Sequence, residues 1–293
     1  MTWLLIVNPA AGSRSFDITS LPDRLAARSI DAEIRVTRSA ADTVTVVSEA
    51  QDRGIRQFAA VGGDGTAHHV LNAVMGREPA ERQTLAILPT GSGTDFIRTF
   101  GHSTDMDAAI DRLADVDRYP IDIGLIEGDF PRRYFLNAAN AGVAAASVDA
   151  AQRLPRAIGS MRYTTAFWAA LAQFSRADAV VQVDRHRFEG EAINIVVANG
   201  QFFGGGLNIA PRATLVDGVF DVQVFSGPKR NAFSIMPRLA FGTHLTHRAV
   251  RRYVGATVAI DVPDTWPVEA DGEMLGSGPI AIRTIPNAID FAI

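Results

Sequence analysis

Up to about residue 121 the chain repeats one pattern, in which a short apolar run ends in a loop of small or polar residues. Residues 3–7, 32–37, 57–61 and 84–88 are predicted as strands, and helical spacing is found over 21–29, 41–53 and 66–75. Continuous apolar strands that alternate with helices are typical of a parallel sheet covered on both faces. Ligands bind such sheets at the carboxyl ends of the strands, so we expect the loops to gather at that edge.

The pattern changes near residue 121. Short β-rich runs separated by Gly, Pro or Asp turns predict an antiparallel second domain, and they are 134–139, 179–183, 192–198, 219–225, 256–262 and 280–284. Helical spacing predicts helices over 148–174 and 230–245. The length of 293 residues suits two domains. The predicted fold class is an α/β N-terminal domain with a Rossmann-like, nucleotide-binding parallel sheet, followed by a C-terminal β-sandwich domain.

Two glycine-rich loops follow predicted strands. In the loop 62–66, Gly-Gly-Asp-Gly-Thr, the glycines leave room for phosphate oxygens, and the next helix begins with free N–H groups. Asp64 beside a phosphate indicates an intervening Mg²⁺ ion, with a structural helix cap as the alternative. The loop 88–96, Leu-Pro-Thr-Gly-Ser-Gly-Thr-Asp-Phe, repeats glycine and hydroxyl residues before a carboxylate. Together the two loops predict a nucleotide cradle.

Two further loops have two interpretations each. The loop 8–12, Asn-Pro-Ala-Ala-Gly, follows the first strand, and a plain turn explains its small residues as well as a ligand does. The segment 271–273, Asp-Gly-Glu, is either an ordinary hairpin turn or a turn whose carboxylate accepts a proton from a substrate hydroxyl.

Lysine is almost absent, since the 28 cationic residues are 27 arginines and Lys229. Walker-type loops, Schiff-base enzymes and protein kinases each depend on a lysine, so such chemistry must use Lys229 or be excluded. The chain has no cysteine, which excludes disulfides and Cys-ligated zinc. The predicted cradle therefore holds phosphate with backbone amides, hydroxyls and carboxylates that direct a metal.

The motifs together resemble the diacylglycerol-kinase-type lipid kinase family, in the superfamily that includes NAD kinases. The resemblance covers essentially the whole chain and rests on the segments 8–12, 62–66, 88–96 and 271–273 in the family's order. The loop 62–66 identifies only the superfamily, whereas the loop 88–96 distinguishes the lipid kinases. The resemblance implies an α/β nucleotide-binding catalytic domain of residues 1–121 plus 285–293, and a β-sandwich lipid-substrate domain of residues 122–284.

The resemblance also implies an activity and a site. The activity is ATP- and Mg²⁺-dependent transfer of the γ-phosphate to a hydroxyl of a lipid such as diacylglycerol, with Glu273 as general base. The catalytic residues implied are Glu273, Asp271, Asp64 and Asp122. The residues implied to bind ATP are Asn8, Pro9, Ala10, Ala11, Gly12, Arg14, Thr37, Gly62, Gly63, Asp64, Gly65, Thr66, Gly91 and Ser92. A structural Mg²⁺ is implied at Asp217 with main-chain oxygens of Thr214 and Val219, and oxygen ligands suit this ion.

Three places depart from the family's pattern. Thr94 stands where many members have asparagine, and the usual loop lysine is replaced by Ser13 and Arg14. Arg14 is the expected substitute, because arginine holds phosphate with two hydrogen bonds. His68 and His69 replace a usual Asn-Glu pair. They are interpreted either as nucleotide contacts or as partly exposed helical histidines.

The second domain contains a basic segment. No Asp or Glu occurs between Asp221 and Asp261, although the net charge of the chain is −4, and the cations that fall there are Lys229, Arg230, Arg238, Arg248, Arg251 and Arg252. A solvated helix face and attraction to anionic lipid, aided by the apolar stretch 163–174, are the two interpretations. Nucleic acid is not an expected partner, because no aromatic stacking pattern accompanies the charge. We expect a cytoplasmic protein, peripheral to the inner face of the membrane, with the oligomeric state, a homodimer included, left open.

Two other functions remain open. An NAD kinase-like phosphotransferase would share the loop 62–66, and a non-catalytic nucleotide or lipid sensor would tolerate Ser13 and the two histidines. No motif identifies the lipid.

Overall fold

The computed structural model describes residues 2–9, 17–77, 81–90, 94–115, 117–154 and 161–293. The chain divides into two compact units, Met1–Asp122 with Pro286–Ile293, and Ile123–Ile285. Strands β5 (Arg118–Gly128) and β17 (Ile280–Ala292) each contain the point at which the chain passes from one unit to the other.

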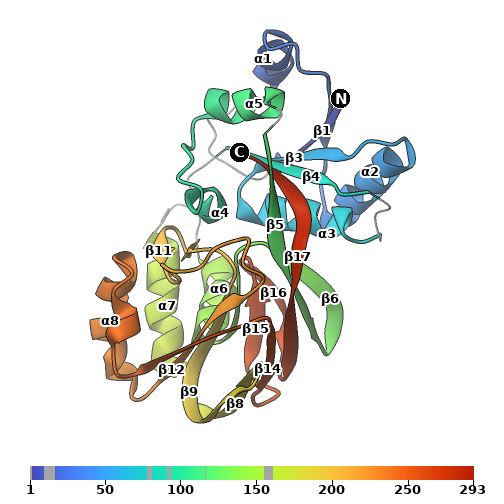
Figure 1. Ribbon diagram of the computed structural model, residues 1–293. Helices are drawn as coiled ribbons and strands as arrows, with labels where there is room; N and C mark the ends of the chain where they lie inside the picture. Colours follow the sequence, from blue (N-terminus) through green and yellow to red (C-terminus); the bar gives the residue numbers. More distant parts are fainter. Residues whose placement is uncertain (1, 10–16, 78–80, 91–93, 116, 155–160) are drawn as a thin grey trace. The chain divides into compact units, whose positions relative to one another are not determined.

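The first unit is built on a parallel sheet in the order β4-β3-β1-β2 (Figure 1). Its strands are β1 (Trp3–Val7), β2 (Ala32–Val36), β3 (Gln57–Gly62) and β4 (Thr84–Pro89). Trp3 lies opposite Ala32 on one side and Gln57 on the other. The end of β17 pairs in parallel with β4, where Asp290 lies opposite Thr84. The predicted α/β domain with a parallel sheet is therefore confirmed.

Strands β1, β3 and β4 are buried along their whole length because helices cover both faces of this sheet. Trp3, Leu5 and Val7 pack with buried residues of α1 (Leu21–Ala26) and α5 (Met106–Ala114). Helices α2 (Ala40–Asp52) and α3 (Asp64–Val74) pack together, and α3 contacts β3. Since side chains alternate along a strand, the remaining residues of β1 face the opposite side of the sheet from α1 and α5.

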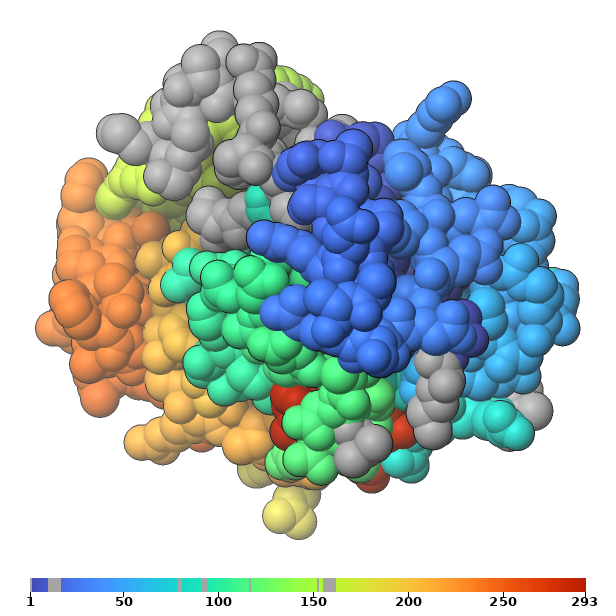
Figure 2. Space-filling view, turned by 90° about the horizontal axis from the view of Figure 1, so that it is seen from above, coloured from blue at the N-terminus to red at the C-terminus, as the bar shows by residue number. Residues whose placement is uncertain are grey.

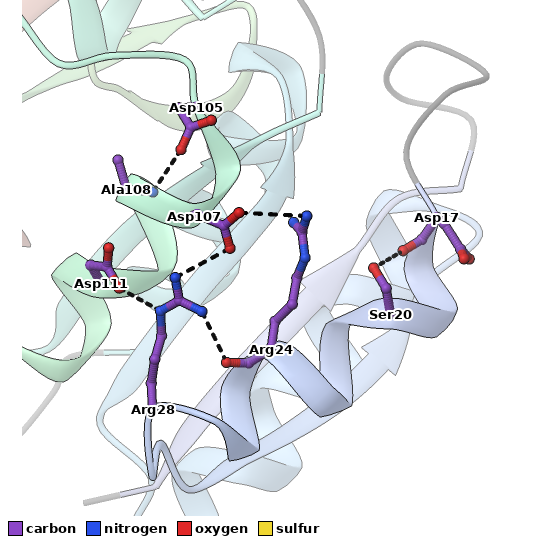
Figure 3. Close-up of polar contacts among 8 residues, drawn as sticks. All are labelled: Asp17, Ser20, Arg24, Arg28, Asp105, Asp107, Ala108 and Asp111. Carbon is purple, nitrogen blue, oxygen red and sulfur yellow. Dashed lines mark hydrogen bonds and ion pairs between the residues drawn. The ribbon is translucent and has the colours of Figure 1, made fainter.

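Charged side chains of α1 and of the turn after it pair with α5 at the surface of the first unit (Figure 3). Arg28 lies 3.2 Å from Asp107 and also pairs with Asp111, while Arg24 lies 3.6 Å from Asp107. Asp105 caps α5 by accepting the N–H of Ala108 at 2.9 Å. These pairs are partly exposed, so each adds only about 0.2–1 kcal/mol to the packing of the two helices.

The second unit is β-rich, and its strands pair antiparallel around the long strand β9 (His186–Ala198). The first half of β9 pairs with β8, and its second half pairs with both β7 and β12. The rings of Phe135 and Phe220 stack in its main core at 5.7 Å. The predicted β-rich second domain is confirmed. Its other strands are β6 (Phe130–Phe135), β7 (Ala138–Gly142), β8 (Ala177–Val183), β10 (Phe202–Phe203), β11 (Leu207–Asn208), β12 (Phe220–Ser226), β13 (Val250–Gly255), β14 (Thr257–Asp261), β15 (Pro267–Ala270) and β16 (Glu273–Ser277).

Three helices are found among the described residues of the second unit: α6 (Val143–Arg153), α7 (Met161–Gln173) and α8 (Ala232–Ala240). Buried Leu171 of α7 and Leu239 of α8 share a core cluster with Val196 of β9. The remaining short elements are α4 (Asp95–Arg98) and the 3₁₀ turns Ile18–Ser20, Lys229–Asn231 and His244–Thr246. In the part of the chain that the structure describes, no helix is both long and apolar enough to cross a bilayer.

Several predicted boundaries are wrong. The helix predicted to begin at residue 148 begins at Val143, directly after Gly142, whose φ of +116° ends β7. A Cβ at Gly142 would lie 2.5 Å from the carbonyl oxygen of Ile193, so glycine is required at this bend. The helix predicted over 230–245 is α8 flanked by two 3₁₀ turns. The last strand continues to Ala292 rather than ending at residue 284.

Candidate functional site

The carboxyl ends of the parallel strands are joined by backbone hydrogen bonds. Asn8 donates its N–H to Val61 at 3.3 Å, Thr37 donates to Val7 at 2.9 Å, and Thr90 donates to Gly62 at 3.3 Å. The segments that follow β1, β2, β3 and β4 therefore start side by side, as expected for a parallel sheet. The structure brings Asn8, Thr37 and the loop 62–66 together at one edge of the first unit.

Asp64 connects the loop 62–66, after β3, to the end of the loop 88–96, after β4. Its carboxylate accepts the backbone N–H of Asp95 at 2.7 Å and that of Phe96 at 3.3 Å. Asp95 and Phe96 open α4, whose first N–H groups have no partner within the helix. Asp64 is also the first residue of α3, where a negative charge is favoured by the helix dipole. One side chain thus fixes the starts of two helices at the sheet edge.

The glycine at the end of β3 is required by the side chain of Thr66. A Cβ at Gly62 would overlap Thr66 Oγ1, so the threonine side chain packs directly on the glycine backbone. Thr66 Oγ1 and Thr94 Oγ1 are both buried and, among the described residues, have no hydrogen-bond partner. Buried hydroxyls without partners are uncommon, and a bound polar ligand is one explanation for them.

The other residues predicted to bind the nucleotide differ in how exposed they are, and several lie outside the described residues. Thr37 is buried and its hydroxyl accepts a hydrogen bond from Thr43 Oγ1 at 3.1 Å, whereas Pro9 is exposed. His68 is buried and His69 is half-buried on α3, so the expectation that both are partly exposed is wrong for His68. The predicted residues that lie outside the described ones are Ala10, Ala11, Gly12, Arg14, Gly91 and Ser92.

The Asp-Gly-Glu motif forms the hairpin turn between β15 and β16 in the second unit. Asp271 and Gly272 have φ of +51° and +83°, and Ala270 pairs with Glu273. This is the geometry of a tight hairpin with two left-handed residues, which Asp-Gly favours. Glu273 is half-buried at the start of β16.

The Asp271 carboxylate holds a distant segment of the same unit. It accepts the N–H groups of Leu136, Asn137 and Ala138 at 2.8, 2.9 and 3.2 Å. These three residues contain the interruption between β6 and β7, which explains why the strand predicted over 134–139 is broken. Asp271 therefore supplies the hydrogen bonds that a neighbouring strand would otherwise provide.

A buried acid that the sequence analysis missed supports the same turn. Glu269 on β15 is only 3% exposed, accepts the N–H of Gly272 at 2.8 Å, and accepts a hydrogen bond from Asn140 Nδ2. Burial raises the pKa of Glu269 to about 8. These two hydrogen bonds oppose the increase, while the charges of Asp271 and Glu273 add to it. The only signal in the sequence was a glutamate between Val268 and Ala270, in an otherwise apolar strand.

Asp122 belongs to the first unit and is 1% exposed. Its Oδ1 accepts the N–H of Asn287 at 2.8 Å, a residue of β17 with φ of +49°. The carboxylate therefore holds the irregular point at which β17 re-enters the first unit. Its predicted metal or catalytic role stays a prediction.

The predicted Mg²⁺ segment lies between β11 and β12. Asp217 is exposed and accepts the N–H of Val219 at 3.2 Å through Oδ1. No group of three or more His, Asp or Glu side chains suited to a metal is found among the described residues, so a cation here would depend on main-chain oxygens. A carboxylate with the carbonyls of Thr214 and Val219 is an oxygen-only donor set, which fits Mg²⁺.

Both parts of the chain match models of known families. Residues 2–126 match the diacylglycerol kinase catalytic domain, and residues 137–293 match the YegS C-terminal NAD kinase beta sandwich-like domain. An α/β unit and a β-rich unit with these matches define a kinase, which is a phosphotransferase. The chain belongs to the diacylglycerol-kinase-type lipid kinase family, and the resemblance predicted from the motifs is confirmed.

Similar proteins are known from several bacteria. A probable lipid kinase YegS-like of Pseudomonas aeruginosa (strain UCBPP-PA14) is 28% identical over 288 residues, which cover 98% of this chain and 92% of that protein. The diacylglycerol kinase of Bacillus subtilis (strain 168) is 26% identical over 281 residues, 94% of this chain and 90% of that protein. A crystal structure of a putative diacylglycerol kinase from Bacillus anthracis str. Sterne has the same fold, with a TM-score of 0.80, 22% identity, and coverage of 99% and 96% of the two chains.

Proposed function

We propose that this chain transfers the γ-phosphate of ATP to a hydroxyl group of a lipid, with Mg²⁺ as the metal. The observation that carries the proposal is the contact of Asp64 with Asp95 and Phe96, which holds two strand-end loops at one sheet edge. Such an edge suits a nucleotide, because backbone amides and helix N-termini bind phosphate without a lysine. Lys229 fits this view, since its Nζ donates to the carbonyl oxygen of Ala172 in the second unit.

In the proposed reaction, the residues named from the family resemblance take these roles. The loop 8–14, Thr37, the loop 62–66 and the loop 91–92 bind ATP, with Arg14 replacing the usual lysine. Bound Mg²⁺ would neutralise charge on the phosphates. Glu273 takes the proton from the lipid hydroxyl, the hydroxyl oxygen forms a bond to the γ-phosphorus, and the bond from that phosphorus to the bridging oxygen breaks to release ADP.

Structural support for Glu273 as base comes from its position in a constrained turn. The carboxylate of Asp271 and that of Glu269 both anchor this turn by accepting backbone N–H groups. A catalytic group on a fixed turn loses little entropy when it meets its substrate. The proposal assigns Asp217, with Thr214 and Val219, to a structural Mg²⁺ that takes no part in the reaction.

The test is incubation of the protein with labelled ATP, Mg²⁺ and a total bacterial lipid extract, followed by mass analysis of the lipids. We expect one lipid class to gain a phosphate, and diacylglycerol comes first among candidates because the Bacillus subtilis relative is named a diacylglycerol kinase. Two separate controls should give no product: the wild type without Mg²⁺, and Glu273→Gln with Mg²⁺. Wild-type protein that binds ATP but phosphorylates no lipid would contradict the proposal.

A second candidate is NAD kinase-like transfer to a nucleotide hydroxyl. The observation in its favour is the match of residues 137–293 to an NAD kinase beta sandwich-like domain. Replacing the lipid extract with NAD in the same incubation separates the two, since phosphorylated NAD would form only in the second case.

The proposed lipid kinase would act at the inner face of the membrane, from the cytoplasm.

A further inference from the structure

Helix α8 has apolar residues on two opposite faces. Ile235 and Leu239 are buried in the core of the second unit. Phe233 and Pro237 of α8, and Phe241 directly after it, are spaced four residues apart, so they follow one another along a single outer face. Phe233 is 70% exposed and Phe241 is 81% exposed, more than any other large hydrophobic residue in the described part of the chain. Exposed phenylalanines at this spacing are unusual for a helix whose apolar inner face is already packed.

Helix α7 extends this outer face. The ring of Trp168 stacks on that of Phe233, with centroids 4.7 Å apart and planes 23° from parallel. The Nζ of Lys229, just before α8, donates to the carbonyl oxygen of Ala172 in α7 at 2.8 Å. The two helices lie side by side in Figure 1, and α8, in orange, forms open surface in Figure 2. We call Trp168, Phe233, Pro237 and Phe241 the aromatic patch.

The two chain segments that carry the aromatic patch contain basic residues and no acidic ones. Residues 222–260 contain six basic and no acidic residues, and residues 150–177, which include α7, contain four basic and no acidic residues. Asp221, at the border, is buried and already paired with Arg252 at 2.6 Å. Arg230 and Arg238 lie on or beside α8 and are exposed, and neither forms an ion pair with a described residue. This local charge stands in a chain whose net charge is −4.

His247 and the residues around it show that basic residues from α8 and from the segment after it lie close together. Ser234 of α8 lies 3.1 Å from a ring nitrogen of His247, which follows the 3₁₀ turn after α8. Burial, together with the charges of Arg238 and Arg248, lowers the pKa of His247. Positive charges from both segments therefore act at the same place. No carboxylate in either segment offsets them.

We propose that the aromatic patch and the arginines beside it form a docking surface for an anionic lipid bilayer, into which Phe233 and Phe241 insert. A bilayer interface takes aromatic side chains at the level of the headgroups and cations at its anionic surface. The inference deepens the proposed function by naming where the enzyme meets its lipid, and its test needs neither nucleotide nor turnover.

The test is co-sedimentation of the full chain with phosphatidylcholine vesicles, with and without phosphatidylglycerol. We expect binding only when phosphatidylglycerol is present, weakening as salt is added. Arg230→Gln with Arg238→Gln should weaken binding about thirtyfold at low salt, since each arginine near such a surface contributes about fivefold. Phe233→Ser with Phe241→Ser should weaken it by at least about tenfold. Equal binding to both vesicles, or to neither, would overturn the proposal.

Val44→Ser is the matched control, because Val44 is 51% exposed on α2 of the first unit. It should bind vesicles as the wild type does, and an equal loss in this variant would overturn the assignment to α8. If Phe233→Ser unfolds through loss of the Trp168 contact, Phe241→Ser alone carries the test. A concentration-dependent dimer that Phe241→Ser abolishes, without any vesicle binding, would assign the surface to a second copy of the chain instead.

Phosphoryl transfer in detergent micelles separates this inference from the proposed function. Variants that lose vesicle binding but keep transfer in micelles support the docking surface. Wild-type protein that binds anionic vesicles but transfers no phosphate supports the surface while the proposed function fails. Variants that bind vesicles normally overturn the surface, whatever their activity.

Discussion

The carboxylate of Asp271 provides hydrogen bonds that a neighbouring strand would otherwise provide. Asp271 accepts three consecutive N–H groups at the break between β6 and β7, while its own backbone forms the turn that carries Glu273. The motif therefore couples a proposed catalytic residue to the folding of a segment more than a hundred positions earlier in the chain. A substitution at Asp271 is expected to act on stability as well as on activity.

Asp271→Ala should lower the free energy of unfolding by about 2–4 kcal/mol, because buried N–H groups lose a charged acceptor. Urea unfolding measures the effect. Asp129→Ala, at an exposed position between β5 and β6, should change stability by less than about 0.5 kcal/mol. Equal stability of the two variants would show that the three hydrogen bonds contribute nothing.

Glu269 predicts a dependence of stability on pH. Its pKa is about 8 in the folded chain against an ordinary value of 4.5, so folding takes up a proton between these pH values. The unfolding free energy should fall as pH rises through this range, by up to about 1.4 kcal/mol per pH unit. Histidines titrate in part of the same range, so the comparison is between wild type and Glu269→Gln. In the variant, the decrease of the unfolding free energy with pH should lack the contribution of Glu269. Parallel curves of unfolding free energy against pH for the two proteins would show that Glu269 is ionised throughout.

At the scale of elements, the start of α4 depends on a side chain from the start of α3. Asp64 provides this link, and α4 itself is only four residues long. A helix this short has little stability of its own, so its position follows its cap. The loop 88–96, which leads into α4, is therefore placed by the loop 62–66.

Asp64→Ala should reduce stability by about 1–2 kcal/mol, as loss of an N-cap does, and reduce phosphoryl transfer at least about a hundredfold through misplacement of the loops. Asp105→Ala is the matched control, because Asp105 caps α5 with a similar bond to Ala108. The control should lose comparable stability and keep its transfer activity. Equal activity in the two variants would remove Asp64 from the site.

The strands of the first unit could be predicted closely from the sequence. The runs predicted at 3–7, 57–61 and 84–88 match β1, β3 and β4 to within one residue, because strands buried on both faces are apolar throughout. The end of β17 could not be predicted in this way. Pro286 and Asn287 interrupt the apolar pattern after residue 284, yet the strand continues through them, and Asp122 accepts the N–H of Asn287 there.

For the whole molecule, the fold class and the family followed from the sequence because glycine-rich loops after apolar strands are visible as a local pattern. The supports of the candidate site did not follow. Asp271 contacts residues far away in the chain, and Glu269 was missed because a carboxylate is normally taken as exposed. Both facts depend on tertiary packing, which no local pattern contains.

Glu273→Gln tests the proposed reaction in the chain described here. It should lower phosphoryl transfer by at least about a hundredfold, the usual contribution of a general base. Thermal unfolding and binding to anionic vesicles should be unchanged, since Glu273 lies outside the docking surface. Near-normal turnover would reject Glu273 as the base without affecting the family assignment.

The return of β17 to the first unit affects the order in which the two units can be completed during synthesis. Pro286–Ile293 complete the first unit, yet they follow all of the second unit in the chain. Phe291 is 1% exposed and packs on Phe96 and Phe100, at 5.2 and 4.9 Å between ring centroids. A ribosome that has made β1 to β4 must therefore translate the whole second unit before Phe291 can fill this core. The unit that begins first is the last to be finished during synthesis.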